Sequence, residues 1–102
     1  MSEKIADYVE SLIDEFVDIA DDFSTSGLID EEGFGAFIDY SIEKMREFRT
    51  PDTSEIVDSI NEYITLFYHI IMVANTFDEI EFDSLMGAFI EEIIEFISYI
   101  RS

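Results

Sequence analysis

The sequence contains no cysteine, one proline and one histidine among its 102 residues. Without cysteine the chain forms no disulfide, offers no thiolate to a metal ion and has no thiol nucleophile. The single histidine, His69, has no second histidine, cysteine or lysine placed to complete a catalytic dyad, and residues 66–69 lack the Glu-x-x-His spacing of di-iron bundles. No glycine-rich phosphate loop is present, and no carboxylate pair stands apart as an acid–base pair. We therefore expect no enzymatic activity and no cofactor.

Basic residues are also scarce. Five Lys and Arg face 25 Asp and Glu, which gives a formal net charge of −20, and no Lys or Arg lies between Arg49 and Arg101. Such a surface repels nucleic acids and anionic membranes and attracts basic proteins or cations. Adaptation to a salty cytoplasm, or solubility alone, would give a similar charge. Halophilic proteins, however, usually have a core less rich in Ile and Phe.

Long apolar runs are missing, although apolar residues are plentiful. They make up 48% of the chain and include ten Phe, so a packed core is expected rather than disorder. The length is that of one domain. The first residues are charged and lead into an amphipathic segment, so we expect neither a secretion signal nor a membrane span. The expected location is the cytoplasm, which would be the host cytoplasm if the protein is viral.

Apolar residues recur with the helical period in four segments. The first segment carries Ile5, Val9, Leu12, Ile13, Phe16, Ile19 or Ala20, and Phe23; the second carries Phe34, Phe37, Ile38, Ser41, Ile42, Met45 and Phe48. The third carries Ile56, Ile60, Ile64, Phe67, Ile71 and Ala74; the fourth carries Leu85, Met86, Phe89, Ile93, Phe96, Ile97 and Ile100. Four helices with short connections predict an all-α fold, an antiparallel four-helix bundle that forms one domain over residues 1–102.

Breaking and capping residues predict the ends of the first two helices. Residues 24–27, Ser-Thr-Ser-Gly, should end the first helix. Asp30 should cap the second, with Ile29 and Phe34 forming a hydrophobic staple across the cap. Thr50 and Pro51 should stop the second helix. Its last turns carry three cations that complement the helix dipole, namely Lys44, Arg46 and Arg49.

The third and fourth helices have similar signals. Asp52 is followed three residues later by Glu55, an arrangement typical of a helix cap. Residues 75–78, Asn-Thr-Phe-Asp, should separate the third helix from the fourth. The sequence therefore predicts one break near the middle of the chain and one in each half.

The two halves, approximately residues 3–49 and 52–101, resemble each other. A shift of 51 residues aligns Ile5, Asp7, Ile13, Phe16, Ile19, Thr25 and Ile29 with Ile56, Asp58, Ile64, Phe67, Ile70, Thr76 and Ile80. After one inserted residue, Gly-Ala-Phe-Ile at 35–38 matches the same four residues at 87–90. We interpret this as a duplicated helical hairpin, which predicts that the first helix corresponds to the third and the second to the fourth. The Gly-Ala pairs are expected to allow a close helix crossing.

The halves differ on the side of the first and third helices that faces away from the apolar stripe. Asp14, Asp18, Asp21 and Asp22 align with Thr65, His69, Met72 and Val73, and Val17 aligns with Tyr68. No residue from 63 to 77 carries a formal charge when His69 is neutral. A helix that is apolar nearly all round is normally buried on more than one side. We therefore expect a homodimer interface at Thr65, Tyr68, His69, Met72 and Val73; a foreign partner and burial inside an irregular bundle are the alternatives.

Residues 22–33 resemble the calcium-binding loop of the EF-hand family. Asp22, Ser24, Ser26 and Asp30 stand at the first, third, fifth and ninth positions of that loop. The twelfth position, where the family has a Glu that gives two oxygens to the ion, is Gly33. The resemblance thus implies at most a degenerate cation binder with these four residues as weak ligands. A capped turn accounts for the same residues, and no metal site is expected.

The charge distribution favours a binding protein. Helical residues rise ~1.5 Å each, so Asp14, Asp18 and Asp21 are spaced along the axis about as phosphates are along one DNA strand. We expect this acidic face to occupy a basic, nucleic-acid-binding protein, as small phage inhibitors of restriction or CRISPR nucleases and immunity proteins do; no motif specific to those groups is present. The face comprises Asp14, Asp18, Asp21, Asp22, Asp30, Glu31 and Glu32. A structural or regulatory homo-oligomer that uses the third helix is the alternative.

Overall fold

The computed structural model describes residues 2–28 and 30–102, which form helices and connections without a strand. The helices are α1 (Ser2–Ser26), α2 (Glu31–Glu47), α3 (Ser54–Met72) and α4 (Glu79–Arg101), with a short 3₁₀ helix, η1 (Ala74–Thr76), before α4. The all-helical class predicted from periodicity is confirmed. Among the described residues, no helix has both the length and the apolar character that crossing a bilayer requires.

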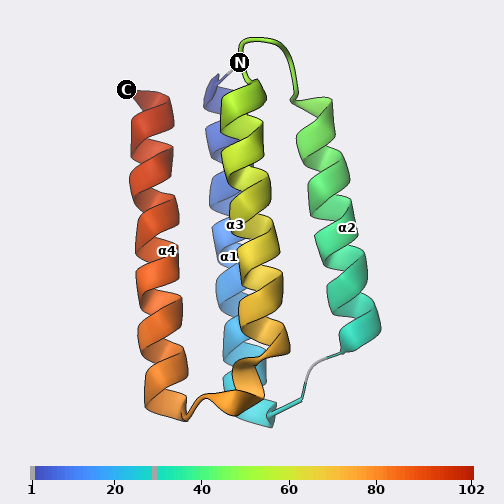
Figure 1. Ribbon diagram of the computed structural model, residues 1–102, viewed down its shortest axis with the longest axis vertical. Coiled ribbons are helices and arrows are strands. Elements are labelled where there is room, and N and C mark those ends of the chain that lie inside the picture. The colour runs from blue at the N-terminus through green and yellow to red at the C-terminus, as the bar shows by residue number, and fades with distance from the viewer. Residues whose placement is uncertain (1, 29) are drawn as a thin grey trace.

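The four α-helices lie side by side, and the closest pairings do not lie within the hairpins α1–α2 and α3–α4. Figure 1 shows α1 starting and α4 ending at the same end of the molecule as the α2–α3 connection. The closest pairings are α1 with α4 and α2 with α3, and α1 also contacts α3. The two helices of each hairpin, α1 with α2 and α3 with α4, therefore approach each other less closely than these pairs.

An aromatic cluster occupies the middle of the core. Phe16 of α1 and Phe67 of α3 are buried and stack with their ring centroids 4.1 Å apart. The ring of Phe89 on α4 lies 5.9 Å from each of them. Phe34 of α2 meets Phe67 edge to face at 5.8 Å. One large ring from each helix thus reaches the same place, and such rings bury ~150–250 Å² apiece.

The apolar stripes face this core as predicted, with one exception. Buried stripe residues include Ile5, Val9, Leu12, Phe16 and Ala20 on α1; Phe34, Ile38, Ser41 and Met45 on α2; Ile60, Ile64, Phe67 and Ile71 on α3; and Met86, Phe89, Ile93 and Ile97 on α4. The hydroxyl of Ser41 donates to the Phe37 carbonyl oxygen at 2.8 Å, which satisfies it in the core. The prediction for Leu85 is wrong: it is 36% exposed, and Phe82, one turn earlier, is buried instead.

Side-chain caps begin α2 and α4. Asp30 accepts the Gly33 N–H at 3.2 Å and caps α2 as predicted, whereas Ile29, its expected partner in the staple, lies outside the described residues. Asp78 accepts the Glu81 N–H at 2.7 Å and caps α4. A side-chain hydrogen bond with Asp78 and the charge of that residue also raise the pKa of the Glu81 carboxyl above its ordinary value.

The first helix is longer than predicted. The Ser-Thr-Ser segment does not break α1, which continues to Ser26 and ends at Gly27, where φ is 71°. The Ser26 hydroxyl donates to the Asp22 carbonyl oxygen at 2.8 Å, and the Gly27 N–H donates to the Phe23 carbonyl oxygen at 2.7 Å. Three polar residues are compatible with a last helical turn; the left-handed conformation that ends it favours glycine.

The start of α3 differs from the predicted cap. Thr53 precedes α3, not Asp52, and its side chain makes no cap hydrogen bond. Its hydroxyl donates instead to the Phe48 carbonyl oxygen at 2.8 Å and accepts the Thr50 N–H at 2.8 Å. The buried Thr53 side chain therefore closes the turn between α2 and α3, a role that a pattern of helix-capping residues does not reveal.

The Gly-Ala pairs do not mark close helix crossings. A Cβ added to Gly35 or to Gly87 would meet nothing within 4 Å, and Ala36 and Ala88 are exposed. The expected crossing is wrong because both pairs lie away from the core-facing stripes of α2 and α4. Each of these glycines lowers helix stability relative to alanine, and no neighbouring atom would clash with a Cβ at either position.

Replacing Gly35 and Gly87 by Ala should therefore stabilise the protein by about 0.5–1 kcal/mol at each site, because the flexible unfolded chain loses entropy and no atom is displaced. Thermal unfolding followed by circular dichroism should show a midpoint rise of about 4–8 °C per kcal/mol. Gly27→Ala is the control, and its positive φ predicts a lower midpoint. A fall in the midpoint for Gly87→Ala would contradict the placement of α4.

Candidate functional site: two grooves between consecutive helices

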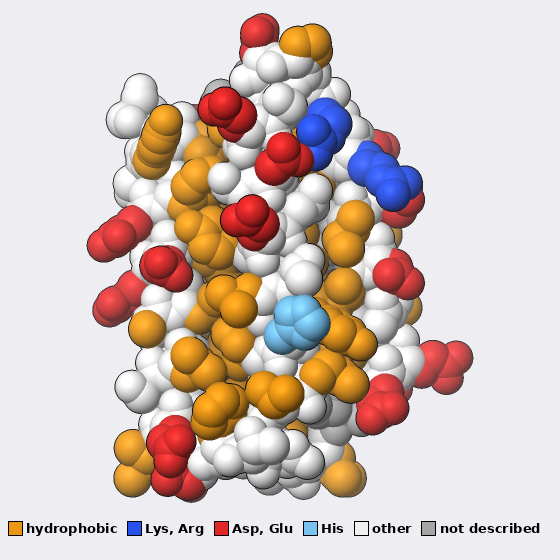
Figure 2. Space-filling model, viewed as in Figure 1, with side chains coloured by type: hydrophobic (Ala, Val, Ile, Leu, Met, Phe, Trp, Pro, Cys, Tyr) orange, Lys and Arg blue, Asp and Glu red, His pale blue; other side chains and the backbone are white. Residues whose placement is uncertain are grey.

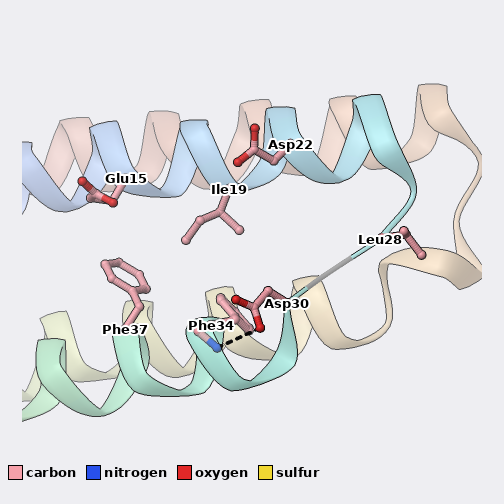
Figure 3. Close-up of a pocket in the computed structure, with 8 residues that line it drawn as sticks. Glu15, Ile19, Asp22, Leu28, Asp30, Phe34 and Phe37 are labelled. Atoms are coloured by element: carbon pink, nitrogen blue, oxygen red, sulfur yellow. Dashed lines mark hydrogen bonds between the residues drawn. The ribbon is translucent and has the colours of Figure 1, made fainter.

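A groove of ≈270 Å³ lies between α1 and α2. Its lining residues are Glu15, Ile19, Asp22, Leu28, Asp30, Gly33, Phe34 and Phe37. Figure 3 shows Ile19 and Phe37 reaching toward each other across the gap, while Glu15 and Asp22 lie along α1. This site, called the α1–α2 groove below, thus combines an apolar floor with carboxylates at its sides.

The predicted acidic face is exposed throughout but is wider than this groove. All seven of its residues are exposed, namely Asp14, Asp18, Asp21, Asp22, Asp30, Glu31 and Glu32. Asp22 and Asp30 come together in the α1–α2 groove. Asp14 lies on the other side of α1, in a hollow shared with Arg101. Glu15, which lines the groove, was not predicted from the sequence, because the prediction considered the series of aspartates along α1 and Glu15 is not part of that series.

Four of the five Lys and Arg form ion pairs away from this groove. Arg101 joins the end of α4 to the start of α1 through Glu3 at 3.3 Å, Asp7 at 2.7 Å and Glu10. The hydrogen bond with Glu10 is the main cause that raises the pKa of the Arg101 guanidinium; desolvation opposes it, and the contact with Asp7 adds to the rise. This ion-pair cluster closes the α1–α4 pairing at one end.

The cations near the end of α2 are engaged too. Lys44 pairs with Glu47 at 3.5 Å, and Arg46 pairs with Glu43 at 2.9 Å. Arg49, expected in the last turns of this helix, lies beyond its end at Glu47 and pairs with Asp58 of α3. Within residues 2–28 and 30–102, no ion pair involves Glu15, Asp18, Asp22 or Asp30. The charge around the α1–α2 groove is not neutralised by the chain itself.

A larger groove, of ≈620 Å³, lies between α3 and α4. Its lining residues are Leu66, His69, Ile70, Val73, Phe77, Leu85, Ala88, Phe89 and Glu92. Leu66 and Val73 are each 45% exposed, so large apolar side chains stand open to solvent here. Figure 2 shows hydrophobic side chains gathered around the pale blue histidine, with carboxylates above this area and along both sides of the view. This site is called the α3–α4 groove.

The residues predicted for a dimer interface lie around His69 but are not all equally open to solvent. His69 and Val73 line the α3–α4 groove, and Thr65 lies in a shallow depression that adjoins it at His69. Met72 is exposed beside them. Tyr68 is half-buried, and its ring stacks on Phe34 of α2 at 5.7 Å with an angle of 5° between the planes. Tyr68, which we expected a second copy to bury, is therefore partly buried by Phe34 of the same chain.

The two grooves lie at corresponding positions of the repeat inferred from the sequence. A shift of 51 places Glu15, Ile19 and Asp22 on Leu66, Ile70 and Val73, and a shift of 52 places Gly33 and Phe37 on Leu85 and Phe89. The floor is the same in both grooves, with an Ile and a Phe. The sides differ, since Glu15 and Asp22 correspond to Leu66 and Val73. One groove is therefore suited to cations and the other to apolar groups.

The EF-hand-like residues do not form a loop. Ser24 and Ser26 belong to α1, the Ser26 hydroxyl is bonded to the Asp22 carbonyl oxygen, and Asp30 caps α2. No group of three or more His, Asp or Glu side chains in the described part of the chain is arranged to hold a metal ion. The geometry gives the weak calcium resemblance no support.

Comparisons with protein-family models, with curated protein sequences and with solved structures find no match for this chain. Its function is therefore inferred from the two grooves themselves.

Proposed function

We propose that the protein is a non-catalytic acidic binding protein whose α1–α2 groove, with the exposed back of α1, engages a basic surface that normally binds nucleic acid. The observation that carries this proposal is the combination of Glu15, Asp22 and Asp30 around an apolar floor. A Lys or Arg side chain would lay its aliphatic stem along Ile19 and Phe37 and place its charge among the carboxylates. Among the described residues, no ion pair occupies these carboxylates.

The exposed back of α1 extends the same charge along the helix. Asp14, Asp18 and Asp21 are exposed, and the rise of ~1.5 Å per residue spaces them roughly 5–6 Å apart along the axis. A row of fixed charges on a helix needs no ordering on binding and steers a basic partner toward it. Inhibition of a nuclease or another nucleic-acid-binding protein, as phage inhibitors and immunity proteins achieve, is the activity this arrangement favours.

We also propose that the fold is an antiparallel bundle made by duplication of one hairpin. A twofold that exchanges α1 with α3 and α2 with α4 also exchanges the α1–α4 pairing with the α2–α3 pairing, and these are the two closest pairings. Phe16 and Phe67, which correspond in the repeat, stack on each other at the centre. Both observations support the duplication, which in turn explains why there are two grooves of related construction.

Neutralising the back of α1 tests the proposed function. The variant carrying Asn at Asp14, Asp18, Asp21 and Asp22 should lose binding to a basic partner captured from the native source, because the charges that attract it are gone. Binding of the wild-type protein should weaken steeply with salt, and a short DNA duplex should compete for the partner. Calorimetry or surface plasmon resonance against the captured partner measures all three effects.

The matched control neutralises four exposed carboxylates elsewhere, at Asp39, Asp52, Glu79 and Glu91. Its net charge equals that of the α1 variant, so it should retain binding within a few fold if position matters. Equal affinity of the α1 variant and the wild type at low salt would refute the proposal. Equal loss in both variants would show that total charge alone is responsible.

Self-association through α3 is the second candidate. The specific observation in its favour is the open apolar surface formed by Leu66, Met72 and Val73 next to His69. Surfaces of this kind often mark interaction sites in proteins. A homodimer that buries them would make the protein a structural or regulatory oligomer whose acidity maintains solubility.

Met72→Asp tests self-association, because Met72 is exposed in the chain and should tolerate a charge unless a second copy covers it. Light scattering of the wild type should give about twice the monomer mass of 11.8 kDa if the protein is a dimer, and the variant should give the monomer mass. A wild-type protein that is monomeric at all accessible concentrations would exclude this second candidate.

A further inference from the structure

The α3–α4 groove is a docking site distinct from the acidic surface, and we propose that it receives the apolar face of a helix from a partner protein, flanked in that partner by Lys or Arg. The inference does not depend on the α1–α2 groove binding anything. It follows from the length of the groove, the chemistry of its sides and the charges at its two ends.

The groove has the length of a short helical contact. On α3 its sides run from Leu66 to Val73, and on α4 from Leu85 to Glu92. Seven residues at ~1.5 Å each give about 10 Å, or two helical turns. A bound helix of that length presents side chains at positions i, i+3 or i+4, and i+7, which is the usual set of anchors in helix-in-groove recognition.

The sides and floor are apolar and open. Leu66, Val73 and Leu85 are 36–45% exposed and stand around the buried Phe89. In the corresponding α1–α2 groove, Glu15 and Asp22 occupy the positions of Leu66 and Val73. The two sites therefore share a floor but offer opposite chemistry at the sides, and the α3–α4 groove takes apolar side chains.

Carboxylates stand at both ends of this groove. Glu92 lines it, and Glu62 lies one turn before Leu66 in the adjoining depression. At the other end Asp78 follows Phe77, which lines the groove, and caps α4. The pKa of the Tyr63 hydroxyl is raised, first by burial and then by the charges of Glu92, Glu62 and Glu95. The contribution of these carboxylates indicates a negative potential near Glu62 and Glu92.

These charges select a basic partner over a second copy of the chain. A second copy also carries a net charge of −20, and four of its five Lys and Arg pair with its own carboxylates. It would bring acids against acids at both ends of the groove. A helix with Lys or Arg on either side of its apolar anchors instead forms ion pairs at both ends while burying the exposed Leu and Val side chains.

A displayed library of helical peptides of about 18 residues, roughly five turns, provides the probe. Apolar residues are fixed at the anchor positions, and the flanks vary among Lys, Arg, Glu, Gln and Ser. Selection for peptides that bind the full chain should enrich Lys and Arg in the flanks. Enriched peptides should bind the Leu66→Glu, Val73→Asp double variant at least about tenfold more weakly, because this variant restores the acids found in the α1–α2 groove.

The matched control is the Tyr40→Glu, Ile94→Asp double variant, which adds the same charge at residues that are 63% and 50% exposed and lie outside the groove. It should bind the peptides within about twofold of the wild type. The α1 variant described above should also still bind them, so that failure of the acidic-face proposal and failure of this one are distinguishable.

Four results would overturn the inference. The first two are a selection that enriches no peptide for the wild type over the Leu66→Glu, Val73→Asp variant, and enriched peptides that lack basic flanks. The others are peptide binding weakened equally in the groove variant and the control, and a wild-type dimer in sedimentation experiments that the groove variant abolishes. The last of these would assign the groove to a second copy.

Discussion

Phe16 and Phe67 stack at the centre of the molecule, and the rings of Phe34 and Phe89 from the other two helices pack against this pair. The stacked pair joins α1 to α3, which are not neighbours in the chain, while α4 packs beside α1 and α2 packs beside α3. Offset aromatic stacking contributes ~0.5–1.5 kcal/mol beyond the area it buries. With α1 and α3 meeting in the middle, a groove remains between α1 and α2 and another between α3 and α4, floored by Ile19 and Phe37 in the first case and by Ile70 and Phe89 in the second.

The charge imposes a second constraint. A net charge of −20 opposes a compact state through self-repulsion, and two of the five Lys and Arg join separate elements. Arg101 holds the end of α4 against the start of α1, and Arg49 joins the α2–α3 turn to α3. The remaining carboxylates are left to solvent or to a partner. The acidity around the α1–α2 groove and its absence from the sides of the α3–α4 groove follow from differences at corresponding positions of the two halves.

Much of the fold was predictable from periodicity, which identifies the face of a helix that is buried. The stripes of α1, α2 and α3 agree with burial, and Asp30 caps α2 as expected. Periodicity does not say which helix faces which, so the α1–α4 and α2–α3 pairings were not predicted. It also placed Leu85 in the stripe of α4 and missed Phe82, because residues three apart at the edge of a stripe differ by only a small rotation about the helix axis.

The sites were predicted less completely, since a groove needs residues from two helices. Comparing the halves identified Asp22 and Val73, but Glu15 and Leu66 are equivalent in the same alignment and were overlooked. Phe77, Ala88 and Glu92 could not be assigned to a groove before α3 and α4 were placed together. The Gly-Ala pairs show the opposite error, a motif interpreted as packing that lies on the surface.

The central claim is that two grooves of common construction have acquired different binding chemistry. Titration of the isotopically labelled full chain with a short oligolysine, followed through backbone amide shifts, tests it most directly. The account predicts that the shifts concentrate around Glu15, Asp18, Asp22 and Asp30, disappear at high salt and leave Leu66, Val73 and Ala88 nearly unchanged. Shifts spread evenly over the acidic residues of all four helices would contradict it, because the acidity would then be a uniform property of the surface.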